Sequence, residues 1–563
     1  MQLTAAPILS VICALLACRA VRATYRLEPL STIYIPYDYD NDGEGVFDID
    51  AAAVEQSAYD SEASLLYAAG DRYVHILDLS DPSKLSIIFK HELTTRANDI
   101  ELCGDYVGYV VEGATSQDNG YVVVHQKYTG YHWPEYRIIE VGSKPDMLKF
   151  SHTCDLIITA NEGEAAEIGS QFVNPEGSIS IVRDFTSIRP DVQTIDFTSF
   201  NAYASYYEWL GVRAPYKGQL NGDVYNTFSQ NMEPEYIAID EEDRYAYICL
   251  QENNAIAKVD IQSNAILELL PLGIKDWSNL DLDASDKDGK IATKSFDIYS
   301  LYQPDAIKLY RSQMTGRDYL ITANEGDKFE YTLGSDDWDE VKRGEDLHDD
   351  GDLSDKISSD LDDEMNDDDD LGRLQFSKFD GLDDDGKVEY PHFFGARGVS
   401  VFFPGSQTME CVWDSGDEVE RVMATYYPDV FNANTKPDEA DKESPEDLMD
   451  TRSDNLGPEC ESIEVGTING QDFAFFGVDR SAAILIYRIY DSYYGPTLSF
   501  ESVYRAGGTS DTFEDLLEDR DLGDLDPEDL KFVSSTDSAT GIPLLIVTST
   551  VSGTVSIYHI VDN

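Results

Sequence analysis

One complete repeat unit of the chain reads EPEYIAIDEEDRYAYICLQENNAIAKVDI, from Glu233 to Ile261. It begins with a proline, an acidic residue and an apolar residue within a few positions. An apolar run from Tyr245 and a second, alternating run ending at Ile261 follow. Runs of this kind, bounded by turn residues, are typical of paired strands. The stretch therefore predicts a small antiparallel sheet that opens with a Pro-acid element.

The same unit recurs along the chain. Further Pro-acid elements are KPDML at Lys144–Leu148, QPDAI at Gln303–Ile307, GPECESI at Gly457–Ile463 and DPEDL at Asp526–Leu530. Each is followed by an apolar strand, and two earlier strand pairs lack the Pro-acid start. The count of strand pairs predicts an all-β fold, a β-propeller of about seven blades. Two tandem β-sandwiches are the alternative, but no Pro/Gly/Ser-rich linker divides the chain, which favours a single domain over residues 24–563.

One segment departs from the strand pattern. From Asp336 to Asp370, eighteen of thirty-five residues are Asp or Glu, and only Lys342, Arg343 and Lys356 oppose them. Like-charge repulsion and a low apolar content predict a disordered acidic insertion within one blade when no cation is present. We expect it to contribute almost nothing to a core.

The N-terminus predicts secretion. A short apolar run from Ala5 to Cys18 precedes Val-x-Ala ending at Ala23, which is typical of a signal peptide over residues 1–23. A membrane anchor is the alternative, but a spanning helix needs about 20 apolar residues. The apolar C-terminal stretch alternates with polar residues and predicts two strands joined at Ser552-Gly553, so no membrane anchor is expected there.

The charge of the chain indicates which partners it can bind, and its cysteine content limits the number of disulfides. The net charge of −67 repels nucleic acid and anionic membranes and attracts cations and basic partners. After removal of the signal segment the chain keeps Cys103, Cys154, Cys249, Cys411 and Cys460. This odd number allows at most two disulfides and leaves the pairing open.

Three Gly-containing acidic turns are candidate calcium loops, because calcium prefers hard oxygen ligands. Their candidate ligands are Asp38, Asp40 and Asp42 in the first turn, Asp283, Asp286 and Asp288 in the second, and Asp383 and Asp385 in the third. An Asp-Gly turn is also ordinary hairpin chemistry. Three such turns in a protein exposed to millimolar calcium predict that at least one of them binds the ion.

The Pro-acid elements suggest a second metal site. If each begins the innermost strand of a blade, Asp146, Glu235, Asp305, Glu459 and Glu528 form a ring at one end of the central axis. Glu162, Glu252 and Glu325, at the far ends of the following strands, are then expected at the opposite rim. The alternative is that each acid only caps a turn through a side-chain hydrogen bond.

Catalytic motifs are mostly absent from the sequence. It contains no G-x-S-x-G elbow, no H-E-x-x-H and no Walker loop, and its eight His are scattered. Paired carboxylates are too frequent in such an acidic chain to indicate a catalytic pair. No catalytic or organic cofactor-binding residue is therefore predicted.

Several long motifs resemble a known family: PDML…ITANEGE, NPEGSISIV, EPEYIAI…AYICLQENNAIAKVDI, YQPDAI…YLITANEGD and SGTVSIYHI. They are similar to the mesenchyme-specific cell-surface glycoprotein family, of the choice-of-anchor I type, from about Phe47 to Ile560. The resemblance implies an extracellular protein of a biomineral matrix. Bacterial relatives that often carry an alkaline-phosphatase label imply a different possibility, a hydrolase.

Three functional hypotheses follow. The first is a secreted, non-enzymatic matrix protein of a calcified structure, shell or skeleton, that interacts with calcium or with a calcium mineral surface. The second is a metal-dependent phosphatase or phosphodiesterase whose carboxylate ring holds metal ions. The third is an adhesive module for other matrix proteins.

Overall fold

The computed structural model describes residues 25–562 except residues 169–170, 220–224, 334–335 and 480. The predicted signal segment, residues 1–23, lies outside the described residues.

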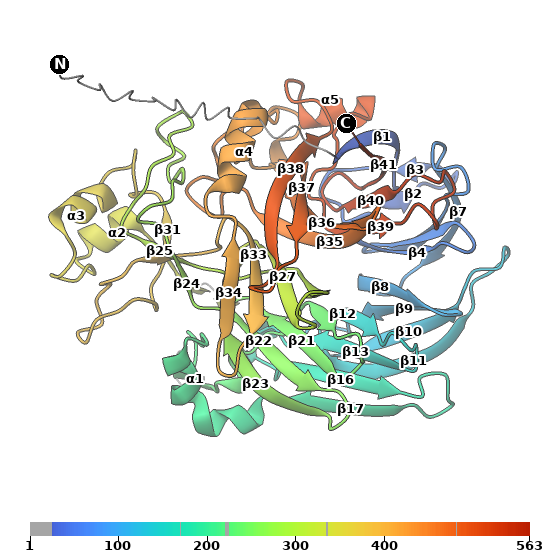
Figure 1. Ribbon diagram of the computed structural model, residues 1–563, viewed down its shortest axis with the longest axis horizontal. Coiled ribbons are helices and arrows are strands. Elements are labelled where there is room, and N and C mark those ends of the chain that lie inside the picture. The colour runs from blue at the N-terminus through green and yellow to red at the C-terminus, as the bar shows by residue number, and fades with distance from the viewer. Residues whose placement is uncertain (1–24, 169–170, 220–224, 334–335, 480, 563) are drawn as a thin grey trace, which may run out of the picture.

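Seven four-stranded antiparallel sheets form the body of the described chain (Figure 1). The first three are β4 (Gln56–Asp60), β5 (Leu65–Ala69), β6 (Tyr73–Asp78) and β7 (Ser86–Glu92); β8 (Ala97–Cys103), β9 (Tyr106–Val111), β10 (Asn119–Gln126) and β11 (Glu135–Ser143); and β12 (Pro145–Phe150), β13 (Leu156–Asn161), β16 (Ser178–Arg183) and β17 (Asp191–Asp196). The next two are β20 (Ile237–Ile239), β21 (Tyr245–Leu250), β22 (Ala255–Asp260) and β23 (Ala265–Pro271); and β26 (Ile307–Arg311), β27 (Asp318–Asn324), β33 (Gly398–Pro404) and β34 (Met409–Asp414). The last two are β35 (Cys460–Ile468), β36 (Gln471–Val478), β37 (Ala483–Tyr490) and β38 (Thr497–Arg505); and β39 (Asp529–Val533), β40 (Leu544–Ser549), β41 (Thr554–Asp562) and β1 (Tyr25–Tyr34).

The sheets follow one another in a closed ring. The first strand of each sheet contacts the first strand of the next, in the order β4, β8, β12, β20, β26, β35 and β39, and β39 contacts β4 again. The N-terminal β1 pairs with the C-terminal β41, from Tyr25 opposite Asp562 to Tyr34 opposite Thr554, so the last sheet joins both ends of the chain. The prediction of an all-β propeller is confirmed.

Burial explains why the strands read as continuous apolar runs. The middle strands pack against neighbouring sheets on both faces, and all six residues of β40 are buried. The outer strand β7 alternates between exposed and half-buried residues because one face meets solvent. The predicted turn after β40 is confirmed, with Ser549 opposite Thr554 and with Gly553 at φ +60°, a conformation that favours glycine.

The acidic insertion is folded in the structure, which corrects the prediction of disorder. It lies between β27 and β33, and its helices are α2 (Gly344–Asp349) and α3 (Ser359–Met365). A five-stranded sheet accompanies them: β24 (Ile274–Asp276), β25 (Tyr299–Leu301), β32 (His392–Phe393), β31 (Gln375–Ser377) and β30 (Val341–Arg343). Figure 1 shows this unit beside the propeller.

The spacing of a few apolar residues accounts for this fold. Leu361 and Met365 lie four positions apart on one face of α3, and both are buried. They join a hydrophobic cluster with Leu347, Trp277 and Phe376. The charge is partly balanced by ion pairs, among them Lys342 to Asp350 at 2.7 Å and Lys294 to Glu364 at 2.9 Å. The acidic composition of the segment does not reveal this amphipathic pattern, which depends on the order of the residues.

The remaining elements are short. The helices are α1 (Ala204–Leu210), α4 (Glu418–Tyr426) and α5 (Phe513–Asp519), with 3₁₀ turns η1 (Thr198–Tyr203), η2 (Ser229–Asn231), η3 (Pro428–Val430) and η4 (Pro437–Glu439). The small hairpins are β2 (Asp38–Tyr39) with β3 (Gly45–Val46), β14 (Ala166–Ile168) with β15 (Gln171–Val173), β18 (Gly218–Gln219) with β19 (Tyr225–Asn226), and β28 (Glu330–Leu333) with β29 (Asp336–Asp339). Of the helices in the described residues, none has the length and apolar character needed to cross a bilayer.

One disulfide joins neighbouring sheets. Cys103 at the end of β8 is bonded to Cys154 in the turn after β12, with a Cα–Cα distance of 5.6 Å. Cys249 and Cys460 are buried free thiols, and Cys411 is an exposed one. The five cysteines outside the signal segment therefore form one bridge of the two that their number allows.

Candidate functional site: a ring of carboxylates

The Pro-acid elements begin the innermost strands, as the repeat predicts. Asp146 is the second residue of β12, Glu235 and Asp305 lie two residues before β20 and β26, and Glu528 lies directly before β39. These four acids occupy equivalent places in their sheets. Because the innermost strands surround the central axis, the four carboxylates gather at one end of it.

The sheet that begins with β35 uses a different acid from the predicted one. The side chain of Glu459 accepts a hydrogen bond from Arg452, with a Nε–Oε1 distance of 2.5 Å. An irregularity in the pairing of β35 with β36 lies between Cys460 and Ile463. Glu461 in this segment is the residue that interacts electrostatically with Asp526 and Glu528. Glu461 therefore replaces Glu459 in the ring.

The prediction that Glu162, Glu252 and Glu325 form an opposite rim is wrong. Each follows the second strand of its sheet, and that strand runs antiparallel to the first, so its end returns to the start of the first strand. Asn161 pairs with Pro145, for example, and brings Glu162 beside Asp146. These three acids thus lie at the same end as the Pro-acid residues.

We call the resulting set the carboxylate ring. Its ten members share one end of the central axis and lie in the strands of six of the seven sheets, or a few residues before or after them. They are Glu55, Asp146, Glu162, Glu235, Glu252, Asp305, Glu325, Glu461, Asp526 and Glu528.

The ring is electrostatically strained. Burial, followed by the neighbouring Glu252, raises the pKa of Glu235 well above its usual range. Burial and the charge of Glu325 raise the pKa of Asp305 in the same way. Burial and the charge of Asp526 raise the pKa of Glu528. Like charges that are close together and partly removed from water favour binding of protons or of a cation.

Three members of the ring have the spacing of a metal site. One carboxylate oxygen from each of Glu461, Asp526 and Glu528 lies within 4.8 Å of the other two. Oε2 of Glu461 is buried without a hydrogen-bond partner within the described residues, and so are Oε2 of Glu235 and Oε2 of Glu252. Hard oxygen donors with unused lone pairs fit calcium.

Two basic side chains pair with acids at one edge of the ring. Lys144 contacts Glu162 and Glu164, at 2.8 and 2.7 Å from Nζ to the carboxylate oxygens. Arg96 contacts Glu55, with 2.5 Å between Nη2 and Oε1. Burial nevertheless raises the pKa of Asp146 to about 6 and that of Glu162 to about 7, with neighbouring acids adding to the effect and Lys144 opposing it.

Two of the three predicted calcium loops are hydrogen-bonded hairpin turns. Oδ1 of Asp40 accepts from the backbone amides of Asp42 and Glu44, both at 2.9 Å, while Asp38 pairs with Arg72. In the third loop, Oδ1 of Asp383 accepts from the amides of Asp385 at 2.9 Å and Lys387 at 3.1 Å, and its Oδ2 from Ser354. In both loops the leading carboxylate is occupied by the protein itself.

The remaining loop belongs to a buried group of acids. The side chains of Asp283, Asp286 and Asp288 are 1%, 11% and 3% exposed, and all three raise the pKa of Asp450, which burial brings to about 7. Oδ1 of Asp450 accepts from Ser453 at 2.7 Å, whereas its Oδ2 is buried without a partner among the described residues. Asp450 joins this loop from more than 150 residues away, so the sequence pattern missed it.

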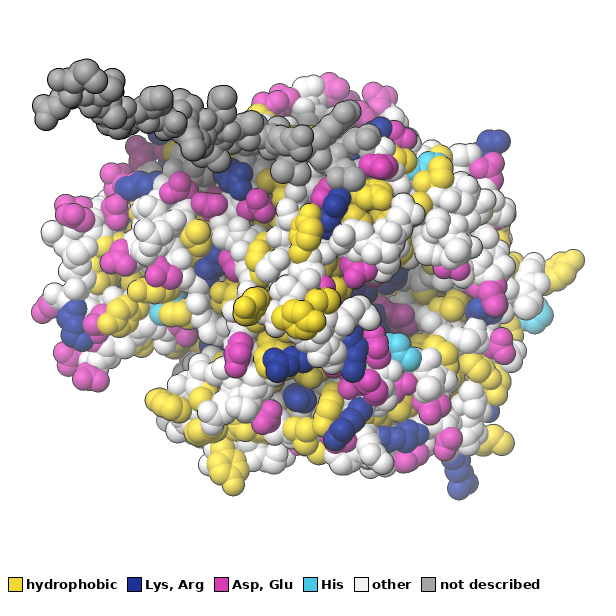
Figure 2. Space-filling view, in the orientation of Figure 1, with side chains coloured by type: hydrophobic (Ala, Val, Ile, Leu, Met, Phe, Trp, Pro, Cys, Tyr) yellow, Lys and Arg dark blue, Asp and Glu magenta, His cyan; other side chains and the backbone are white. Residues whose placement is uncertain are grey.

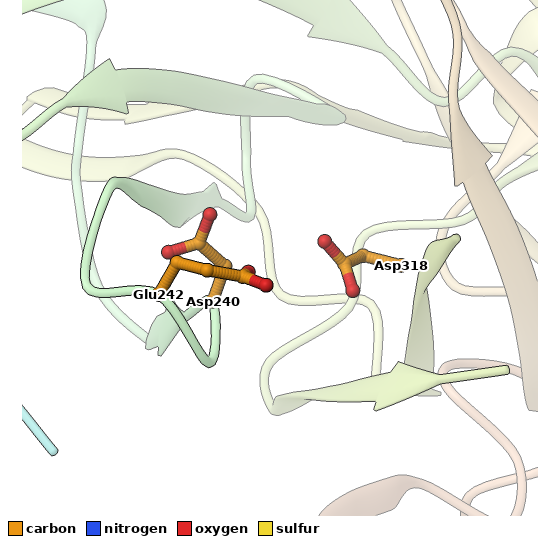
Figure 3. A group of neighbouring side chains, drawn as sticks. All are labelled: Asp240, Glu242 and Asp318. Carbon is orange, nitrogen blue, oxygen red and sulfur yellow. The ribbon is translucent and has the colours of Figure 1, made fainter. Parts of the chain in front are cut away.

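A further group of acids is already neutralised by arginine. Asp240, Glu242 and Asp318 place one oxygen each within 4.8 Å of one another, and Figure 3 shows Asp318 facing the other two. Nη1 of Arg311 lies 2.9 Å from Glu242 and 3.1 Å from Asp318. This is an ion-paired cluster, and the carboxylate ring remains the better cation site.

Comparisons with known proteins give the family of the chain and several similar proteins. The model of the choice-of-anchor I domain family matches residues 55–492. The mesenchyme-specific cell surface glycoprotein of Strongylocentrotus purpuratus is 26% identical over 92% of this chain and 85% of that protein. Gigasin-3a of Magallana gigas is 37% identical over 34% of this chain and 64% of that protein. Among solved structures, the Cps50 (Swd1) β-propeller domain of Myceliophteria thermophila aligns at a TM-score of 0.40 and 8% identity, covering 95% of this chain and 99% of that domain.

Proposed function

Because this chain belongs to the choice-of-anchor I domain family, we propose that it is an extracellular matrix protein that binds calcium through the carboxylate ring. The observation that carries the proposal is the meeting of Glu461, Asp526 and Glu528 at ligand spacing, within a larger set of half-buried and buried acids that repel each other. A divalent cation relieves that repulsion.

The relatives support an extracellular location. One of them is named a cell surface glycoprotein, and the match covers most of both chains. A location outside the cell supplies calcium at millimolar concentration, where weak sites are occupied. We therefore propose the same setting for this chain, in or near a calcified matrix.

The insertion is the proposed contact with mineral. Its apolar residues point inward, and its exposed acids include Asp349, Asp352, Asp363 and Asp368. In Figure 2, acidic side chains are scattered over the visible face, and several lie on the unit that holds α2 and α3. A folded acidic surface presents its charges at fixed spacings, which suits the ordered ions of a crystal better than a flexible loop would.

A calcium isotherm on the mature chain tests the ring. The triple variant Glu461→Gln, Asp526→Asn, Glu528→Gln removes the three ligands without changing their size. The matched control Asp349→Asn, Asp363→Asn, Asp368→Asn removes three exposed acids of the insertion. We expect the ring variant to lose the tightest calcium-binding step and the control to keep it.

The isotherm and a phosphatase assay together separate the hypotheses. Equal binding by the ring variant and the parent would refute the proposed site. Hydrolysis of p-nitrophenyl phosphate by the parent, lost in the ring variant, would favour the metal-dependent phosphatase instead. We expect no hydrolysis, because the proposal gives the ring a binding role without a nucleophile.

A further inference from the structure

The end of the central axis opposite the carboxylate ring gathers lysines. Lys149 on β12, Lys308 on β26 and Lys531 on β39 each stand four residues after the proline of a Pro-acid element. Three residues of extended strand span about 10 Å, so each lysine lies well away from the acid at the start of its own element. Tyr236 lies between the two ends, since it is influenced by Asp305 of the ring and by Asp99 and Asp529 near the lysines.

The lysines line a cavity of about 410 Å³. Three carboxylates, those of Glu101, Glu464 and Asp537, are among the other groups of its wall. The side chains of Lys149, Lys308 and Lys531 are 20%, 26% and 19% exposed. A cluster of lysines is unexpected in a chain with 41 basic and 108 acidic residues.

Each lysine has one acidic partner and unused donors. Lys308 lies 3.0 Å from Glu464, Lys531 lies 2.8 Å from Asp529, and Lys149 contacts Glu101. An ammonium group donates three hydrogen bonds, so these pairs leave donors that can point into the cavity. The carboxylate of Asp529 also accepts hydrogen bonds from the amide and the hydroxyl of Ser57, at 3.1 and 2.8 Å. These bonds hold the carboxylate in place beside the cavity.

The lysines of this cavity repel one another, although carboxylates lie close to each of them. Burial, followed by the charge of Lys308, lowers the pKa of Lys149 to about 7, and Lys531 adds to the effect against Asp99 and Asp529. At Lys531 burial also lowers the pKa, but the charges of Asp529 and Glu464 raise it overall. An added anion would relieve this strain, as a cation would at the other end.

We propose that this lysine cavity binds a small inorganic oxyanion, with Lys149, Lys308 and Lys531 as donors. Three ammonium groups around one cavity match a compact ion with several acceptor oxygens, and phosphate, sulfate and carbonate share that chemistry. The site is separate from the carboxylate ring, and it does not depend on the proposed calcium binding.

The test is titration of phosphate, sulfate and bicarbonate, in separate arms, into the mature chain with EDTA present. The variant Lys308→Met with Glu464→Gln removes a lysine and its acidic partner together, so neither charge is left unpaired. The matched control is Lys356→Met with Glu389→Gln, a Lys–Glu pair in the insertion unit with a 2.5 Å contact. The melting temperature of each variant reports whether it has folded.

We expect at least one anion to bind, about tenfold more weakly in the cavity variant and unchanged in the control. The arms show which oxyanion fits best. The absence of binding in every arm would overturn the proposal. Equal affinity in the cavity variant and the parent would overturn it as well. If the first variant fails to fold, the variant Lys149→Met with Glu101→Gln is used in the same anion titration, with the same expected loss of affinity.

Discussion

Replacing Asp146 by asparagine tests the strain in the carboxylate ring most directly. Burial raises the pKa of this carboxyl from 3.8 to about 6, and Glu55 adds to the effect although Lys144 opposes it. Such a difference corresponds to about 3 kcal/mol of unfavourable free energy in the ionised folded state. The figure is an upper value, because the side chain keeps partial access to solvent.

The sign follows from linkage. A carboxyl whose pKa is higher in the folded state than in the unfolded state favours folding more at low pH than at high pH. That relative stability is lost as the pH rises from about 4 to about 6. In EDTA at pH 7.5, Asp146→Asn should therefore raise the free energy of unfolding by up to about 3 kcal/mol. At pH 4 the two proteins should be nearly equal.

Denaturant unfolding monitored by tryptophan fluorescence at both pH values measures the effect. Asp105→Asn, which removes an exposed acid in the turn between β8 and β9, is the control and should change little at either pH. With saturating calcium the order should reverse, because the variant lacks one carboxylate of the ring. A variant that is no more stable than the parent at pH 7.5 in EDTA would refute the electrostatic account of the ring.

Three further perturbations test other parts of the structure. Asp450→Asn should raise the melting temperature in EDTA and reduce its rise on adding calcium, because Asp450 has a pKa of about 7 beside the Asp283 loop; an unchanged calcium response would remove that loop as a cation site. Leu361→Ala should cost about 2–4 kcal/mol in the insertion unit, measured by hydrogen exchange of α3, whereas Asp363→Asn should be silent. Replacing Cys103 and Cys154 by serine should lower the free energy of unfolding by about 2–4 kcal/mol, since the bridge closes a loop with a sequence separation of 51; a smaller loss in denaturant unfolding would show that the bridge constrains the unfolded chain little.

The repeat made the propeller predictable from sequence. Each unit carries its own strand pair and its own Pro-acid start, so local patterns determine the blade and its orientation together. The positions of Asp146, Glu235, Asp305 and Glu528 follow from that regularity. Glu459 fails because the register shift of β35 falls between Cys460 and Ile463, where Glu461 lies, whereas that of β12 falls at Asp146, directly after the proline. A spacing pattern does not show where such a shift falls.

Features that depend on pairing or on distant contacts were harder to predict. Because β13 runs antiparallel to β12, Glu162 at the end of β13 lies at the same end of the sheet as Asp146. Most of β12 and the whole of β13 separate the two residues in the sequence. Asp450 meets the Asp283 loop only in the folded protein. The charge of the insertion predicts disorder, but the four-residue spacing of Leu361 and Met365, which is visible in the sequence, gives α3 a buried apolar face.

The two ends of the axis have one origin in the sequence. The element Pro-acid-x-apolar-Lys occurs at Pro145–Lys149, Pro304–Lys308 and Pro527–Lys531, so three strands carry an acid at one end and a lysine at the other. In the sheet of β20 the position that corresponds to these lysines is Ala238. The lysines therefore occupy only part of the circle of strands around the axis. Opposite charges held apart on rigid strands cannot neutralise each other directly, so each end depends on neighbouring side chains and on added ions for its counter-charge. Under the two proposals made above, one molecule holds a cation and an oxyanion, the two components of a calcium salt, at separate places.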